Sequence, residues 1–201
     1  VTDYDRMTNI SNFTKQKLLT EYSVANVNIF KKFASKVDET VKYLIQLNDG
    51  SIVESVAMKY NHGISLCLST QVGCNMGCRF CASTIGGKQR DLTAGEILGQ
   101  AALLQADLGE RISNIVLMGI GEPLDNYDNV VRFLQNVNHK KGMNIGYRHI
   151  SLSTCGLVDK IDRLAEEEFP ITLSVSLHAP NDLIRNMIMP VNKKYNVDAL
   201  I

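Results

Sequence analysis

Three cysteines lie within eight residues, at positions 74, 78 and 81. Thiolates at such short spacings are the ligands of zinc ions and of iron–sulphur clusters. A closed structural zinc site or an electron-transfer cluster needs four protein ligands, whereas this run supplies three: Cys74, Cys78 and Cys81. The spacing therefore predicts a metal centre with one open position, where substrate chemistry can occur. Gly77 allows a sharp turn before Cys78, and Phe80 can shield the sulphurs from water.

The two remaining cysteines, Cys67 and Cys155, form no second close pair of the zinc-ribbon type. A zinc site completed by a distant fourth ligand stays open as an alternative. We expect Cys155 to be structural, because a buried cysteine usually behaves as a small hydrophobic residue. Cys67 alternates with serines on an expected strand, which is mild evidence against the same role for it.

The composition is that of a soluble globular chain of 201 residues, 45% hydrophobic and 21% charged. No apolar run approaches the roughly 20 residues of a membrane span, and the first residues do not resemble a signal peptide. Cysteines gathered around a metal motif favour a reducing compartment, so we expect a cytoplasmic protein. Because 21 basic residues balance 21 acidic ones, composition gives no support for nucleic-acid binding.

Hydrophobic periodicity predicts an α/β fold: a partial (β/α) barrel of about four β/α units, preceded by a β-hairpin and a helical N-terminal remnant. We divide the chain into residues 1–40, 41–62 and 63–201. The expected elements are helices over 12–22 and 25–35, hairpin strands over 41–47 and 51–60, strands over 64–68, 114–118, 149–153 and 171–178, and helices over 93–109, 128–138, 158–167 and after 181.

Polar residues alternate with apolar ones along three of the expected barrel strands. If the apolar rows face the outer helices, the polar rows line a ligand-filled lumen, because a filled barrel has bulky apolar residues there. The expected lining residues are Ser65, Cys67, Ser69, Ser153, Ser174, Ser176 and His178. A satisfied core histidine is the alternative interpretation of His178.

Glu54 is a candidate proton acceptor. It shares one face of the second hairpin strand with Ile52, Val56 and Met58. Apolar surroundings favour the protonated form of a carboxylate, which suits proton transfer near neutrality. The alternative is an edge-strand glutamate that reaches water.

The pattern Cys-x3-Cys-x-Phe-Cys resembles the signature of the radical S-adenosylmethionine (SAM) superfamily. More specific stretches resemble the RNA adenine carbon-2 methyltransferases called RlmN, and the similarity runs over nearly the whole chain. They are residues 69–74 (STQVGC), 118–124 (MGIGEPL), 152–154 (LST) and 176–182 (SLHAPND).

This resemblance implies a [4Fe-4S] cluster on Cys74, Cys78 and Cys81, with its fourth iron chelated by SAM. It also implies that Gly121 and Glu122 bind the amino group of SAM. Further SAM contacts are expected from Ser153, Ser176, Leu177 and His178.

In the implied reaction, one SAM methylates a carrier cysteine and a second yields a deoxyadenosyl radical. The methyl carbon then adds to adenine carbon 2, and the covalent protein–RNA adduct is resolved by Glu54 as base and Cys67 as second thiol, leaving a disulfide. The family acts on 23S rRNA and probably tRNA, takes electrons from a donor such as flavodoxin or ferredoxin, and is expected to be monomeric and free of membranes.

The chain is expected to be a fragment, because it begins without an initiator methionine and stops within an expected helix. The carrier cysteine of the family lies beyond residue 201, so this fragment should hold a cluster and SAM without turning over RNA. Two alternatives remain: the sister activity on adenine carbon 8, which gives antibiotic resistance, and a non-enzymatic iron–sulphur or zinc module.

Overall fold

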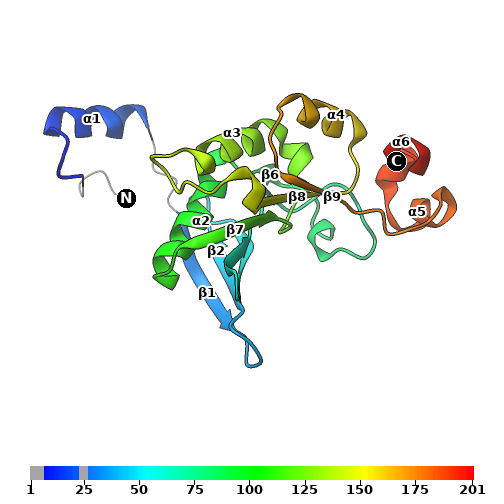
Figure 1. The fold of residues 1–201 in the computed structure, drawn as a ribbon, viewed down its shortest axis with the longest axis horizontal. Helices are drawn as coiled ribbons and strands as arrows, with labels where there is room; N and C mark the ends of the chain where they lie inside the picture. The colour runs from blue at the N-terminus through cyan, green and yellow to red at the C-terminus, as the bar shows by residue number, and fades with distance from the viewer. Residues whose placement is uncertain (1–6, 23–26) are drawn as a thin grey trace.

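The computed structural model describes residues 7–22 and 27–201. Seven strands form one sheet in the order β1-β2-β3-β4-β7-β8-β9, and two short strands pair as β5-β6 (Figure 1). The strands are β1 (Asn28–Ala34), β2 (Val41–Gln46), β3 (Ile52–Tyr60), β4 (Gly63–Cys67), β5 (Gln71–Val72), β6 (Arg90–Asp91), β7 (Ile112–Leu117), β8 (Ile150–Thr154) and β9 (Thr172–Val175).

Six α-helices and several single 3-10 turns complete the described part of the chain. The α-helices are α1 (Asn12–Glu21), α2 (Ala94–Leu108), α3 (Tyr127–Asn138), α4 (Val158–Glu166), α5 (Asp182–Ile188) and α6 (Val197–Leu200). The 3-10 turns are η2 (Ala82–Thr84), η3 (Pro123–Asn126), η4 (Tyr147–His149) and η5 (Pro190–Lys193). None of the helices in the described ranges is both long and apolar enough to cross a membrane.

The sheet joins an antiparallel half to a parallel half. Strands β1 to β4 pair antiparallel, and β4, β7, β8 and β9 pair parallel. Each parallel crossover carries a helix, as βαβ connections require. The α/β class, the hairpin and the four β/α units are confirmed, and the sheet is open rather than closed into a barrel.

Helix α2 begins and ends where the sequence predicts. Thr93 and Glu96 form a reciprocal capping box, and Gly109 ends the helix in the left-handed region. On its inner face Ile97, Ala101 and Leu104 are buried against the sheet. This packing fixes the helix across the antiparallel strands, where Gln100 accepts a hydrogen bond from Ser55.

The helix expected over 25–35 is wrong. Residues 28–34 form strand β1, which pairs with β2 and carries an irregularity between Ile29 and Lys31; residues 25 and 26 lie outside the described part. The segment contains Ile29, Phe30 and Phe33, types that suit strands, and pairing with β2 outweighs its helical periodicity. The first helix is confirmed as α1, none of whose residues is buried.

The two faces of the sheet differ. One is covered by α2, α3 and α4 and forms the main core, in which Leu66, Ile115 and Leu152 are fully buried. The expected packing of the apolar rows against helices is thus confirmed for β4 and β8. It is wrong for β9, where Leu173 and Val175 remain 37% and 41% exposed because β9 is the edge strand.

Gly73, at the entrance to the cysteine loop, should not tolerate a side chain. Its φ is +75°, and a Cβ would lie 1.9 Å from the carbonyl oxygen of Gly87. We expect Gly73→Ala to lower the free energy of unfolding by at least about 3 kcal/mol, measured by denaturant titration. Gly86→Ala, in the same loop but facing open space, is the matched control; equal stability of the two variants would contradict the expectation.

Candidate active site

A cavity of about 210 Å³ lies at the carboxyl ends of the parallel strands. All three motif cysteines line it, together with five of the six expected cofactor contacts. The lining residues are Cys74, Met76, Cys78, Phe80, Cys81, Thr84, Leu117, Met118, Gly119, Gly121, Glu122, Pro123, Ser153, Thr154, Cys155, Ser176, His178 and Met189. The sixth, Leu177, is not among the lining residues.

Topology brings these distant segments together. The cysteine loop follows β4 and β5, the Gly121–Glu122 turn follows β7, Ser153 lies at the end of β8, and Ser176 follows β9. Because parallel strands end at the same edge of a sheet, their loops meet there. The cysteine loop also rests on the segment after β9, since the backbone N–H of Arg79 donates to the carbonyl of Ile188 at 2.9 Å.

The polar residues just before the cysteine loop are framework rather than cavity lining. The Ser69 hydroxyl donates to the Glu54 carbonyl at 2.6 Å and accepts from the Ile120 N–H at 2.9 Å. Gln71 accepts from the Glu122 N–H at 2.9 Å and donates to Asp125. These bonds hold the cysteine segment, strand β3 and the Glu122 turn in one register.

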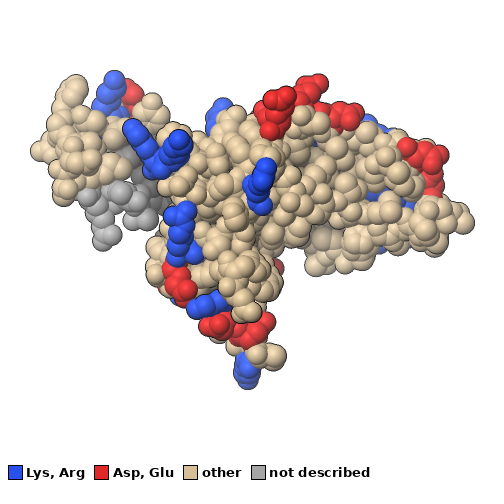
Figure 2. Space-filling view, in the orientation of Figure 1, with Lys and Arg blue, Asp and Glu red and all other residues tan. Residues whose placement is uncertain are grey.

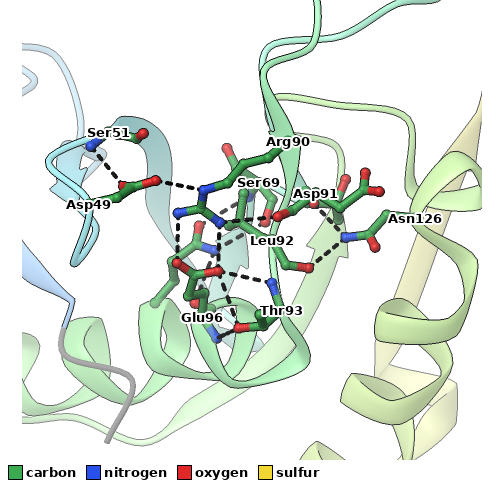
Figure 3. A network of polar contacts seen from close by, with 11 residues as sticks. Asp49, Ser51, Ser69, Arg90, Asp91, Leu92, Thr93, Glu96 and Asn126 are labelled. Carbon is green, nitrogen blue, oxygen red and sulfur yellow. Dashed lines mark hydrogen bonds and ion pairs between the residues drawn. The ribbon is translucent and has the colours of Figure 1, made fainter. Parts of the chain in front are cut away.

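A second network anchors the chain that returns from the cysteine loop to α2 (Figure 3). The Arg90 guanidinium pairs with Asp49 at 2.7 Å and with Glu96 at 2.8 Å. Asn126 donates to the carbonyls of Thr70 and Leu92. Because Glu96 and its partners are partly buried, this network fixes the base of the loop rather than binding a ligand.

Glu122 is a buried carboxylate with no cationic partner. It is 4% exposed and accepts hydrogen bonds from the backbone N–H groups of Cys155 at 2.7 Å and Leu124 at 3.1 Å. Burial raises the pKa of Glu122. None of the ion pairs found among residues 7–22 and 27–201 includes it. Such a group, open to the cavity, is suited to receive an ammonium group.

The cavity thiols differ in how readily they can ionise. Burial raises the pKa of Cys74 and of Cys78. The pKa of Cys155 is raised far more, first by burial and then by the negative charge of Glu122 beside it. Cys155 also packs against Cys78 and Met189, as expected of a structural thiol. Because metal ligands must be thiolates, Cys155 is a poorer ligand than Cys74 or Cys78.

The donor set fits a cluster better than a single ion. No three His, Cys, Asp or Glu side chains in the described ranges are placed to hold one metal ion. The three motif thiols instead line a space of about 210 Å³, several times the roughly 30 Å³ of one water molecule. Soft thiolates without carboxylate ligands are the donors of iron–sulphur centres, so the residues fit the group that the motif implies.

Four of the expected lumen residues lie outside this cavity: Ser65, Cys67, Ser69 and Ser174. Ser65 on β4 and Ser69 just after it are buried, and Ser69 is occupied by the backbone hydrogen bonds described above. The other three expected residues are confirmed as lining. Ser153 and Ser176 face each other at 3.4 Å between hydroxyl oxygens, and His178 packs edge-on against Phe80 with 4.7 Å between ring centroids.

Glu54 and Cys67 share the sheet face that lies opposite the helices. Val56 on β3 is paired with Cys67 on β4, and Glu54 lies two residues along the same face. Diagonal neighbours of this kind have Cα atoms roughly 7–8 Å apart. Burial raises the pKa of Cys67, partly offset by a hydrogen bond from the backbone of Met118, a cavity residue. The two residues therefore adjoin the cavity without lining it.

The expected apolar environment of Glu54 is wrong. Its side chain is 43% exposed, and its carboxylate pairs with Lys42 on β2 at 2.6 Å. The row that Glu54 shares with Ile52, Val56 and Met58 lies on the open face of the sheet, where solvent and Lys42 reach it. All five cysteines are free thiols, so the implied disulfide has no support in the structure.

Sequence reasoning missed several cavity residues. Much of its apolar wall comes from Met76, Met118 and Met189. Beside Glu122 the cavity is lined by Thr154 and Cys155. The sequence could have indicated Thr154 and Cys155 as lining residues, because they directly follow Ser153 at the end of β8. Met189 had no such signal, because it comes from a turn after α5 that only the fold brings to the cavity.

Comparison with known proteins gives consistent results. A sequence profile described as the radical SAM superfamily matches residues 68–200. Proteins named "Probable dual-specificity RNA methyltransferase RlmN" from Clostridium novyi (strain NT) and Alkaliphilus metalliredigens (strain QYMF) are 53% and 56% identical over 201 residues. These alignments cover all of this chain and 59% and 57% of those proteins.

A solved structure shows the same fold. The crystal structure of a radical SAM methyltransferase from Sphaerobacter thermophilus superposes with a TM-score of 0.92 at 40% identity, covering all of this chain and 60% of that one. The chain thus spans somewhat under two thirds of the relatives it matches. The profile match, the shared fold and a cavity lined by the three motif cysteines together show that this chain belongs to the radical SAM superfamily.

Proposed function

We propose that this protein is a SAM-dependent methyltransferase that modifies carbon 2 of adenine in 23S rRNA and in tRNA. The observation that carries the proposal is the cavity itself, where three motif thiols and a buried carboxylate without a cationic partner face the same space. The identity of 53% and 56% to proteins named dual-specificity RNA methyltransferases supports the choice of RNA.

Cys74, Cys78 and Cys81 would hold a [4Fe-4S] cluster, and Gly121 and Glu122 would bind the amino group of SAM. Ser153, Ser176 and His178 line the remainder of the cavity and are proposed as further SAM contacts, with Leu177 beside them. When bound, the cluster and SAM would supply radical chemistry. Carbon 2 of adenine requires it, because this carbon is too electron-poor to displace the methyl group of SAM directly.

Residues of the chain orient the groups that would bind SAM and shield the thiols from water. Backbone N–H groups of Leu124 and Cys155 fix the Glu122 carboxylate in one direction. Gly121 must stay small, because a Cβ there would lie 2.6 Å from the side chain of Gln71. Phe80 and His178 pack together at the cavity wall, where they restrict the access of water to the thiols.

We propose that Glu54 accepts a proton and that Cys67 acts as the second thiol in resolving the adduct between protein and RNA. Their shared sheet face next to Met118 supports this pairing. Lys42 keeps the carboxylate of Glu54 in place. The same face is open in the described part of the chain, so an extruded adenine can approach it.

Removal of the Glu54 carboxylate should separate binding from turnover. We expect Glu54→Gln to lower the methylation rate about 100-fold or more, with cluster content and SAM affinity unchanged, because a positioned base contributes that much. The rate is measured on the product of the complete gene. Glu39→Gln, an exposed partner of Lys59 on the same sheet, is the control; equal rates in both variants would remove Glu54 from the reaction.

Among the described residues, the face of the molecule shown in Figure 2 carries no single basic patch for RNA. Lys and Arg side chains are scattered among acidic ones on the face shown in Figure 2. Lys88 and Arg90 are already paired with carboxylates, which weakens them as phosphate ligands. We propose further that the protein is a cytoplasmic monomer that receives electrons from a donor such as flavodoxin or ferredoxin.

Deletion of the gene tests the proposed function. Nucleoside mass spectrometry of rRNA and tRNA should show loss of 2-methyladenosine, restored by the intact gene. Loss of 8-methyladenosine instead would establish the carbon-8 activity. If neither nucleoside changes, the assignment of this activity is wrong.

A further inference from the structure

Arg185 is a fully buried guanidinium behind the cavity. It is 0% exposed, and its nitrogens donate to neutral oxygens only. The acceptors are the carbonyls of Cys155 at 2.6 Å, Leu177 at 3.1 Å, Tyr195 at 3.4 Å and Ser176 at 3.5 Å, and the side-chain oxygen of Asn192 at 2.8 Å.

No carboxylate in the described part of the chain pairs directly with this charge. The carboxylate of Asp182, which feels the charge of Arg185, is engaged by Asn192 and by the Val197 N–H. Glu122 accepts from the N–H of Cys155, whereas Arg185 donates to the carbonyl of the same residue. Burial of a cation is costly unless a negative charge compensates it, so the apoprotein leaves Arg185 incompletely balanced.

A cluster held by the motif thiolates would bring negative charge close to Arg185. The Arg185 side chain donates to the carbonyl of Cys155, which packs against Cys78, and the Arg185 carbonyl accepts from the N–H of Met189, which packs with both cysteines. Three thiolates outweigh the charge of an oxidised cluster core, and each added electron makes the site more negative.

We propose that Arg185 is a fixed internal cation that balances the three-thiolate site and makes its cluster easier to reduce. Arg185 does not line the cavity, and none of its hydrogen bonds in the described ranges goes to a sulphur, so it is a positioning residue that acts through charge. The inference rests on the cluster site proposed above. The hydrogen bonds alone do not explain why a charged side chain is buried here, because a neutral donor could satisfy the same carbonyls.

The reduction equilibrium of the reconstituted cluster tests this inference. Titration with dithionite, followed by electron paramagnetic resonance, measures how readily the cluster accepts one electron. Coulomb's law at the effective dielectric of proteins gives about a tenfold effect for charges within about 10 Å. We expect Arg185→Gln to lower the equilibrium constant for reduction about tenfold, a shift of about 59 mV to lower potential.

A variant that keeps the charge separates it from packing. Asn192→Ala removes one acceptor of the same network and leaves the guanidinium in place. It should keep the wild-type potential within about twofold in the equilibrium constant, even if it unfolds more easily. A tenfold shift in this variant overturns the inference, and this outcome can be read even if Arg185→Gln does not fold.

An unchanged potential in a folded Arg185→Gln protein also overturns it. Iron and sulphide content is measured on the same samples. Failure of the wild-type chain to take up a cluster would refute the proposed function itself, whereas a normal cluster with a potential indifferent to Arg185 would refute only the role given to this residue.

Discussion

Replacement of Cys78 by alanine should lower the iron and sulphide content of the anaerobically reconstituted chain at least about tenfold, because a cluster held by three thiolates loses a third of its protein ligands. Cys78 lines the cavity with Cys74 and Cys81 and is fixed by its place in the loop that rests on Ile188. Chemical analysis of iron and sulphide, normalised to protein, measures the effect.

Cys155→Ala provides the matched control. Cys155 is equally buried and lines the same cavity, but its pKa is raised by burial and by Glu122, so it should remain a thiol. This variant should keep its full complement of iron. If Cys155→Ala loses the cluster and Cys78→Ala retains it, the assignment of ligands is wrong.

Replacement of Glu122 by glutamine should weaken SAM binding about 10- to 100-fold while the cluster content stays near that of the wild type. A charge-assisted hydrogen bond contributes about 1.5–3 kcal/mol, and an amide has a single oxygen, so it cannot accept from both the Cys155 and the Leu124 N–H as the carboxylate does. Equilibrium dialysis of the reconstituted chain with labelled SAM measures the affinity.

Glu110→Gln tests whether any lost carboxylate has the same effect. Glu110 is exposed, pairs with Lys59 and precedes the start of β7, whose opposite end carries the cavity-lining Leu117. It should bind SAM as the wild type does. Equal affinity of the Glu122→Gln variant and the wild type would show that the ammonium group binds elsewhere.

Local signals in the sequence predicted most of the fold. The hairpin strands over 41–47 and 51–60, the helix over 93–109 and the strand over 114–118 each depend on residues within a few positions, and all of these elements are confirmed. The motif cysteines were predictable for the same reason, since their spacing sets the loop. Their meeting with Glu122 and Ser176 was predictable only through the rule that parallel strands end at one edge.

Long-range contacts could not be predicted in the same way. Strand β1 exists because β2 offers it a partner, although its residues also suit a helix. The exposure of Glu54 depends on Lys42 in the neighbouring strand and on the open face of the sheet. Arg185 has an ordinary helical position in the sequence, and its burial becomes visible only when β8, β9 and η5 surround it.

The proposed cluster has one iron that no protein residue ligates. Electron paramagnetic resonance of the reduced, reconstituted chain tests this most directly, with spectra recorded before and after addition of SAM. We predict a changed spectrum that saturates with SAM and is weakened by Glu122→Gln. A spectrum that SAM leaves unchanged, in a chain with full iron content, would show a fourth protein ligand and contradict the account.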